Sequence, residues 1–332
     1  MKVIESTRAF REVHSHCVAT IGKFDGVHRG HQAIVGQLLE QSRHHGVPAV
    51  AIVTEPHPEE FFAGDTGDCP ARLSEPQEKI ALLDELGVDC VYLLRFDRAL
   101  SGLSAQQYIR DILVEGLGIR ALIAGSDFRF GHHRQGDFAL LQQHGARYGF
   151  DVIETASCYE GGERISSTGV REHLQRGDFG KVEAMLGRPY GIAGNVVRGQ
   201  QLGRDLGFPT CNVQLDRRTL PLHGVYACRA RIEPAEGPCF DWPGAANIGY
   251  RPTVSRDREA VLEVHLLDYR GDLYGAHMTV FFSHKVRDEE KFDSLEALKE
   301  QIARDVEQVR AVLQGEEDGS QPNRLQDNES TQ

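Results

Sequence analysis

The feature that most constrains the fold is a change in hydrophobic periodicity near Gly187. Before Gly187, short apolar runs alternate with amphipathic segments whose apolar residues recur at helical spacing. After it, apolar and polar residues alternate in short runs separated by glycine-rich turns. The first pattern predicts a parallel sheet with helices on both faces, and the second predicts a compact antiparallel barrel. A chain of 332 residues also exceeds one ordinary hydrophobic core, so we expect two domains.

The N-terminal half predicts strands that alternate with helices. Strands are expected at 18–22, 49–53, 90–94, 119–124 and 150–154, and helices at 32–43, from Ser104 to about 116–118, at 169–175 and at 179–186. Ligands of such sheets bind beyond the carboxyl ends of the strands. The segments TIGKFDGVHRGH and AGSDFRFG fall at such ends, so we expect the ligand site of this half there.

The C-terminal half predicts strands at 224–232 and 262–267, with Tyr226, Cys228, Ala230 and Ile232 on one face of the first. A helix is expected to begin at 293–294, and the residues beyond Gly315 have too few apolar side chains to fold. The predicted domains are therefore 1–186 and 187–314, followed by a disordered tail at 315–332.

Composition excludes several classes of protein. No run of 18 apolar residues exists, so no membrane span is expected, and the N-terminus lacks the apolar region of a secretion signal. Seven cysteines without a C-x-x-C pair indicate reduced thiols in a cytoplasmic protein. The net charge of −12 argues against nucleic acid as a partner. We expect small-molecule substrates and a monomer or weak homo-oligomer.

His28 and His31 carry the strongest chemical signal in the N-terminal half. The segment H-x-G-H lies where a helix begins, and helix N-termini attract anions. Imidazoles there can donate to a triphosphate that is attacked at its α-phosphorus, and no serine nucleophile is needed when the attacking oxygen belongs to a second substrate. H-x-G-H resembles the signature of the nucleotidylyltransferase superfamily, and the chain has no Walker-type phosphate loop. A turn with two solvated histidines, or a metal site on them, fits the same residues.

A second segment, RISSTGVREHLQRGDF, places Ser167 and Thr168 at a helix start and Arg171 in its first turn. Hydroxyl, amide and guanidinium groups in that arrangement can hold departing phosphates. A plain capped helix is the alternative.

In the C-terminal half, GNVVRGQQLGRDLGFPTCNV supplies closely spaced glycines, including Gly199, Gly203 and Gly207, that permit a loop to fold over phosphates. Thr210 and Asn212 then offer hard oxygen ligands suited to Mg²⁺. A glycine- and proline-rich connection whose side chains satisfy turn backbone is the alternative.

Four segments of the N-terminal half, TIGKFDGVHRGH, TEPHPEEFF, GSDFRFGHHRQGD and RISSTGVR, together resemble the FMN adenylyltransferase module of the bacterial bifunctional riboflavin kinase/FAD synthetase family. The glycine-rich segment, HGVYACRARI, ANIGYRPTV and LEVHLLDYRGDLYG resemble its riboflavin kinase module. The resemblance runs from about Val18 to Asp305. It implies a nucleotidylyltransferase-like, Rossmann-like α/β domain and a six-stranded antiparallel kinase barrel with a terminal helix. It also implies that ATP phosphorylates riboflavin to FMN and adenylylates FMN to FAD, with Mg²⁺ as cofactor.

The resemblance implies three groups of site residues. The ATP site of the adenylyltransferase would comprise Gly22, Phe24, Asp25, Gly26, His28, Gly30, His31, Ser167, Thr168 and Arg171. The crevice between flavin and nucleotide would comprise Asp127, Phe128, Phe130 and Gly131. In the kinase, Thr210 and Asn212 would bind metal and phosphates, and Glu263 would be the general base. A primary alcohol is a poor nucleophile, so a carboxylate that accepts its proton is chemically reasonable. A solvated, outward-facing glutamate fits the strand pattern equally.

Three residues depart from the family pattern: Lys23 replaces a frequent asparagine, Thr54 replaces a phenylalanine, and Gly169 replaces a longer residue. None of them is a reacting group. They keep two alternatives open: a riboflavin kinase whose N-terminal domain only binds nucleotide, and a non-enzymatic module that responds to flavin or nucleotide.

Overall fold

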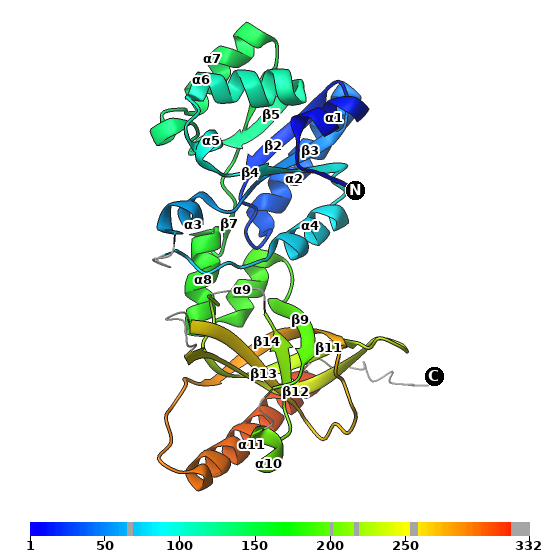
Figure 1. Ribbon diagram of the computed structural model, residues 1–332, viewed down its shortest axis with the longest axis vertical. Helices are drawn as coiled ribbons and strands as arrows, with labels where there is room; N and C mark the ends of the chain where they lie inside the picture. Colours follow the sequence, from blue (N-terminus) through cyan, green and yellow to red (C-terminus); the bar gives the residue numbers. More distant parts are fainter. Residues whose placement is uncertain (65–68, 200–201, 216–218, 253–257, 320–332) are drawn as a thin grey trace, which may run out of the picture. The chain divides into compact units, whose positions relative to one another are not determined.

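A six-stranded parallel sheet organises the N-terminal half of the computed structural model, which describes residues 1–64, 69–199, 202–215, 219–252 and 258–319 (Figure 1). The chain divides into one unit of Met1–His173 with Lys181–Arg188 and a second of Leu174–Gly180 with Pro189–Gln332. The strand order of the first unit is β1-β4-β3-β2-β5-β6. The strands are β1 (Lys2–Ile4), β2 (Cys17–Gly22), β3 (Ala49–Glu55), β4 (Cys90–Arg95), β5 (Ile119–Gly125) and β6 (Asp151–Thr155).

Helices cover both faces of this sheet. The helical segments are α1 (Thr7–Val13), α2 (Arg29–His45), α3 (Pro58–Ala63), α4 (Pro76–Glu85), α5 (Arg98–Ser101), α6 (Ala105–Gln107), η2 (Tyr108–Leu117), η3 (His132–Arg134), α7 (Phe138–Tyr148), α8 (Ser167–Arg176) and α9 (Phe179–Leu186). Successive strand residues enter opposite cores, because side chains of a strand alternate. Ala19 packs with α1, η2 and α7, whereas Val18 packs with α2 and α4. A short hairpin of β7 (Tyr159–Glu160) and β8 (Glu163–Arg164) precedes α8.

The predicted α/β class is confirmed, but several elements differ from the prediction. Helices α1, α3, α4, α5 and α7 and the β7–β8 hairpin were not predicted. Strand β1 was not predicted, because three residues at the chain start carry little pattern; it pairs in parallel with the edge of β4. The helix expected after Ser104 is one α-turn followed by a π-helical segment that ends at Gly118 in the left-handed conformation.

The second unit is a closed barrel with the strand order β10-β13-β12-β11-β14-β9, and all its pairings are antiparallel. The strands are β9 (Gly191–Val197), β10 (Cys211–Gln214), β11 (Gly224–Glu233), β12 (Phe240–Pro252), β13 (Arg258–Leu266) and β14 (His277–Arg287). A short helix, α10 (Leu202–Asp205), lies between β9 and β10. The predicted six-stranded barrel is therefore confirmed.

The terminal helix α11 (Leu295–Gly319) packs on the outside of the barrel. Its Val306, Val309 and Leu313 form a buried cluster with Ala227 of β11. Residues on both faces of β11 are consequently buried, since Tyr226 and its alternate neighbours fill the barrel interior while Ala227 lies under α11. The helix continues beyond Gly315, where the tail was predicted to begin, and residues 320–332 of that tail lie outside the described residues.

Candidate active sites

The loop between β2 and α2 has an unusual backbone. Phe24, Gly26 and Val27 have φ angles of 50°, 78° and 40°. Positive φ is costly for residues with a side chain, by about 1–3 kcal/mol each, and persists only where the surroundings impose it. Asp25 supplies part of that constraint, because its 1% exposed carboxylate accepts hydrogen bonds from the backbone of Leu73 and Ser74 at 3.0 and 3.1 Å. The sequence therefore holds this loop in one shape.

The two N-terminal motifs meet at Asp25. The Arg171 guanidinium forms an ion pair with the Asp25 carboxylate, and the Ser167 hydroxyl donates to the Asp25 carbonyl oxygen at 2.9 Å. Both partners come from α8, which places its N-terminus against the β2–α2 loop. Thr168, beside Ser167, is exposed. Arg171, predicted from sequence to hold phosphates, is thus also a structural clamp on the loop.

His28 and His31 form a stacked pair at the start of α2. Their ring centroids are 3.7 Å apart with 12° between the planes, and His28 caps the helix by accepting from the His31 amide at 3.3 Å. Burial, with smaller contributions from the charges of Arg188 and Arg164, lowers the pKa of His28 to about 4. Burial, then the charges of His28 and Lys79, holds the pKa of His31 well below its usual value. Both rings are neutral at pH 7.

The His31 ring is incompletely satisfied. Its Nδ1 is buried and has no hydrogen-bond partner among the described residues, a state that costs about 1–3 kcal/mol. The centroid of the Phe24 ring lies 5.1 Å from the centroid of the His31 ring. Nearby glycines leave room for these rings: a Cβ at Gly30 would be 3.1 Å from the His28 ring, and one at Gly22 would be 3.3 Å from the Phe24 ring. A ligand that offers a hydrogen-bonding group to Nδ1 would relieve the orphaned atom.

The four predicted crevice residues differ in their surroundings. Phe128 stacks on the buried Phe130 with 5.4 Å between ring centroids, and Gly131 lies so close to the backbone of Ala105 that a Cβ would be 2.7 Å from its nitrogen. Asp127 is exposed and pairs with Arg164 at 2.8 Å, three residues before Ser167. Phe130 and Gly131 therefore shape the loop, while Asp127 faces solvent beside the second motif.

Sequence reasoning missed a buried ionic cluster beside these motifs. Arg72 pairs with Glu55 and Glu60, and Lys79 lies 3.2 Å from the His57 ring and 3.4 Å from Glu55. Helical spacing could have indicated that Lys79 is buried, because it lies four residues before Leu83 and both are on the buried face of α4. Lys23, one of the departures from the family pattern, pairs with Glu59 at 2.8 Å.

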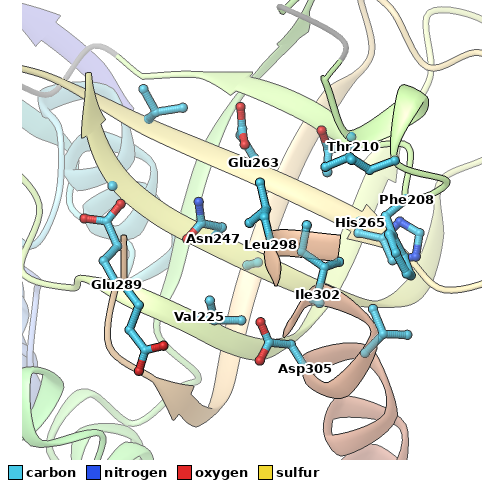
Figure 2. Close-up of a pocket in the computed structure, with 18 of the residues that line it drawn as sticks. Phe208, Thr210, Val225, Asn247, Glu263, His265, Glu289, Leu298, Ile302 and Asp305 are labelled. Atoms are coloured by element: carbon cyan, nitrogen blue, oxygen red, sulfur yellow. The ribbon is translucent and has the colours of Figure 1, made fainter. Parts of the chain in front are cut away.

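A cavity of about 440 Å³ lies between the outer face of the barrel and α11 (Figure 2). One wall is built from the loop before β10 and from β13, and the opposite wall from the end of β14 and from α11. The polar lining includes Thr210, Asn212, Glu263, His265, Arg287 and Asp305. Figure 2 shows Thr210 beside Phe208 and His265, with Glu263 on the same side of the cavity. A pocket of this size accommodates a ligand of drug-like dimensions.

Glu263 and Asn212 face one another across β10 and β13, where they are direct register partners. The three glycines predicted to form the phosphate loop have different structural roles. A methyl group at Gly199 would overlap the Asn212 amide, and one at Gly203 would overlap the carbonyl oxygen of Phe208. Gly207 has a φ of 89° and open space around it, so it supplies a turn.

His265 connects β13 to this loop. Its Nδ1 donates to the carbonyl oxygen of Pro209 at 2.8 Å, and its ring lies edge-on to Phe208 at 5.7 Å. Glu263 and His265 are two residues apart, so both point to the cavity face of β13. One strand therefore carries the candidate base and an anchor for the loop with Thr210.

On the opposite wall, Arg287 donates three hydrogen bonds of 2.8, 2.9 and 3.0 Å to the Asp305 carboxylate. The Asp305 side chain is buried, so this pair fixes α11 to the end of β14. Among the described residues, no group of three or more histidine, cysteine or acidic side chains has a geometry that would hold a metal ion.

Comparisons with known proteins match both units. A family model described as FAD synthetase matches residues 10–169, and one described as riboflavin kinase matches residues 186–313. A Pseudomonas fluorescens protein named bifunctional riboflavin kinase/FMN adenylyltransferase is 48% identical over 312 residues, which is 94% of this chain and 98% of the relative. An Escherichia coli K12 protein of the same name is 50% identical over 289 residues, which is 87% of this chain and 90% of the relative.

A solved structure also resembles the whole chain. A crystal structure described as a macrolide-efflux protein from Streptococcus pneumoniae aligns with a TM-score of 0.75 and 27% identity, over 93% of this chain and 98% of that one. No helix within the described ranges is long and apolar enough to cross a membrane.

Proposed function

The chain belongs to the family of bifunctional riboflavin kinase/FMN adenylyltransferases, and we propose that its two reactions occur at the two sites described above. It phosphorylates riboflavin to FMN with ATP, and it transfers the AMP part of ATP to FMN, which yields FAD and pyrophosphate. The presence of both family domains favours this function over a riboflavin kinase with an inactive partner domain. We assign adenylylation to residues 1–186, phosphorylation to 187–314, and neither to 315–332.

Adenylylation is assigned to the His28–His31 pair. In this reaction a phosphate oxygen of FMN attacks the α-phosphorus of ATP, and the bond to the β-phosphate oxygen breaks. The FMN phosphate is already anionic, so no base is required. The imidazole N–H groups stabilise the charge that develops on the phosphates, a contribution of about 2.7–4 kcal/mol per donor. The observation that supports this role is the buried Nδ1 of His31, which has no hydrogen-bond partner in the part of the chain that the structure describes.

The other N-terminal residues have supporting roles in this proposal. Ser167, Thr168 and the α8 N-terminus face the departing pyrophosphate, while Arg171 holds the loop in shape through Asp25. Gly22, Gly26 and Gly30 allow the backbone and rings to approach closely. Phe128 offers a ring for the flavin, and Asp127 lies at the rim with Arg164.

Phosphorylation is assigned to the cavity between the barrel and α11, with Glu263 as the general base. The ribityl hydroxyl of riboflavin attacks the γ-phosphorus of ATP, its proton passes to the Glu263 carboxylate, and ADP leaves. Such proton transfer contributes about 10²–10⁴ in rate. Support comes from the position of Glu263 in the cavity wall, opposite Asn212 and on the same side as Thr210.

We propose that Thr210 and Asn212 hold Mg²⁺ together with ATP phosphates. Their hydroxyl and amide oxygens are hard ligands. Gly199 has no side chain, and a Cβ at this position would overlap the Asn212 amide. The chemistry that the ion supplies there is neutralisation of phosphate charge. Because both reactions consume ATP and all seven cysteines are free, we further propose a cytoplasmic protein. We also propose that it acts as a monomer or weak homo-oligomer and has no nucleic-acid partner.

A time course with riboflavin and MgATP tests the two activities together. We expect FMN to appear first and FAD to follow, with pyrophosphate released only as FAD forms. A second incubation, with FMN and MgATP, isolates the adenylylation step. Accumulation of FMN without FAD in both incubations would contradict the adenylyltransferase assignment and favour a kinase alone.

A further inference from the structure

Lys79 is the one lysine among the fully buried large side chains of the described residues. It lies on α4 with an exposed fraction of 0%, next to Leu83 on the same face. Moving an ammonium group out of water costs several kcal/mol unless other groups compensate its charge. A lysine at this position therefore needs a reason that an apolar residue could not satisfy.

Carboxylates compensate the charge of Lys79. Arg72 and Lys79 face Glu55 and Glu60, and Arg72 also lies 4.0 Å from the carboxylate of Glu75, so two cations stand against three anions. The Lys79 ammonium, however, lies closer to Nε2 of His57, at 3.2 Å, than to Glu55, at 3.4 Å. Burial, then the charges of Lys79 and Arg72, lowers the pKa of His57 to about 2, so the ring is neutral. The contact adds no charge compensation, and its effect is to orient the His57 ring.

The position of His57 connects this contact to the adenylylation site. His57 follows β3, and the H-x-G-H segment follows the adjacent parallel strand β2. The carboxyl ends of neighbouring parallel strands lie at one edge of a sheet, where ligands of this fold bind. The Lys79 charge acts on His31 and on Asp25, and Lys23, Arg72 and Arg171 contribute further positive charge around His57. The Lys79 ammonium, held 3.2 Å from His57, therefore adds to the positive charge at the edge of the sheet where we expect an ATP polyphosphate to enter.

We propose that Lys79 is a positioning residue of the adenylylation reaction, which orients the His57 imidazole toward the polyphosphate and adds a fixed positive charge behind His31. The inference rests on the assignment of adenylylation to the H-x-G-H site. Lys79 itself does not touch substrate, because its side chain is closed off from solvent. Charges held ready in a site that excludes water stabilise developing charge more strongly than mobile ones.

Kinetics of Lys79→Met test the proposal, since methionine has nearly the same length and no charge. We expect kcat for FAD formation to fall about 10- to 100-fold, the value of one charged hydrogen bond, with KM for FMN unchanged. Riboflavin phosphorylation by the same chain serves as an internal control and should keep its rate. Lys181→Met, an exposed position on α9, is the matched control and should change neither activity.

A double-mutant cycle with His57→Gln distinguishes positioning from packing. If Lys79 acts in part through His57, the double variant should be less slow than the product of the two single effects, whereas effects that multiply fully would overturn the proposal. A wild-type kcat in Lys79→Met, or a raised KM for FMN with lowered thermal stability, would also overturn it.

Lys79→Gln covers the case in which the methionine variant does not fold. Its amide can still donate to His57 but carries no charge, so we expect an intermediate kcat, and a wild-type kcat in this variant would overturn the proposal. A His31→Ala variant with normal FAD formation would instead refute the site assignment, whatever the Lys79 variants do.

Discussion

The two candidate sites handle the same nucleotide with different side chains. The N-terminal site is built from neutral imidazoles, a constrained loop and a buried ionic cluster. The barrel site is a cavity with hydroxyl, amide and carboxylate oxygens. The difference follows from the nucleophile. The FMN phosphate is an anion at neutral pH and needs only charge stabilisation, whereas the alcohol of riboflavin must lose a proton and needs a base.

The largest expected effect is in the barrel. Glu263→Gln keeps the shape of the side chain but removes the proton acceptor, so FMN formation should fall by about 10²–10⁴. FAD formation from supplied FMN should remain, because the N-terminal site has no such requirement. Chromatographic assays of both products measure this. Glu233→Gln, an exposed position on β11, is the matched control. Undiminished FMN formation would exclude Glu263 as the base and remove this half of the comparison.

A smaller effect is expected in the N-terminal site. His31→Ala removes one imidazole from a pair, so FAD formation should fall by about 10²–10³, while FMN should accumulate from riboflavin at the normal rate. His44→Ala, an exposed position on the same helix, is the control. An equal fall of both activities in a folded variant would mean that the two reactions do not use separate sites.

The sequence was sufficient for the fold because hydrophobic periodicity differs between the two halves. The strand predicted at 49–53 is observed as Ala49–Glu55, and the helix predicted at 179–186 is α9. Strand β1 was missed because three residues carry no measurable period. The π-helical turns of η2 were missed because their hydrogen bonds join residues five apart in place of four. The spacing of apolar residues does not distinguish the two kinds of helix over so short a segment.

For the sites, local motifs were informative and long-range pairs were not. H-x-G-H correctly indicated a helix start, since His28 is the N-cap of α2. The pairing of Arg171 with Asp25 joins residues 146 positions apart, and no sequence pattern reveals it. The burial of Lys79 also depends on the packing of α4 and was not predicted. The catalytic roles of His28, His31 and Glu263 remain predictions.

The smallest expected effect is on stability: a decrease in pH should destabilise the N-terminal unit more than the barrel. His28, His31 and His57 have lowered pKa values, and all three belong to the N-terminal unit. The pKa of His28 is near 6.5 in the unfolded chain and about 4 in the folded one, so between these pH values the unfolded chain binds a proton that the folded chain does not. The free energy of unfolding is therefore highest above pH 6.5 and falls by about 3 kcal/mol for His28 as the pH decreases toward 4.

A comparison of two spectroscopic signals distinguishes the units, because one follows the barrel alone and the other follows the whole chain. The only tryptophan, Trp242, lies on β12, so its fluorescence follows the barrel, whereas far-ultraviolet circular dichroism follows both units. Between pH 7 and pH 4.5, we expect the urea midpoint measured by circular dichroism to fall more than the fluorescence midpoint. His28→Asn, which keeps a capping side chain without a titrating ring, should reduce that difference. Equal decreases of the two urea midpoints would contradict this prediction. They would mean that acid destabilises the barrel as much as the N-terminal unit, although the three histidines with lowered pKa values lie in the N-terminal unit.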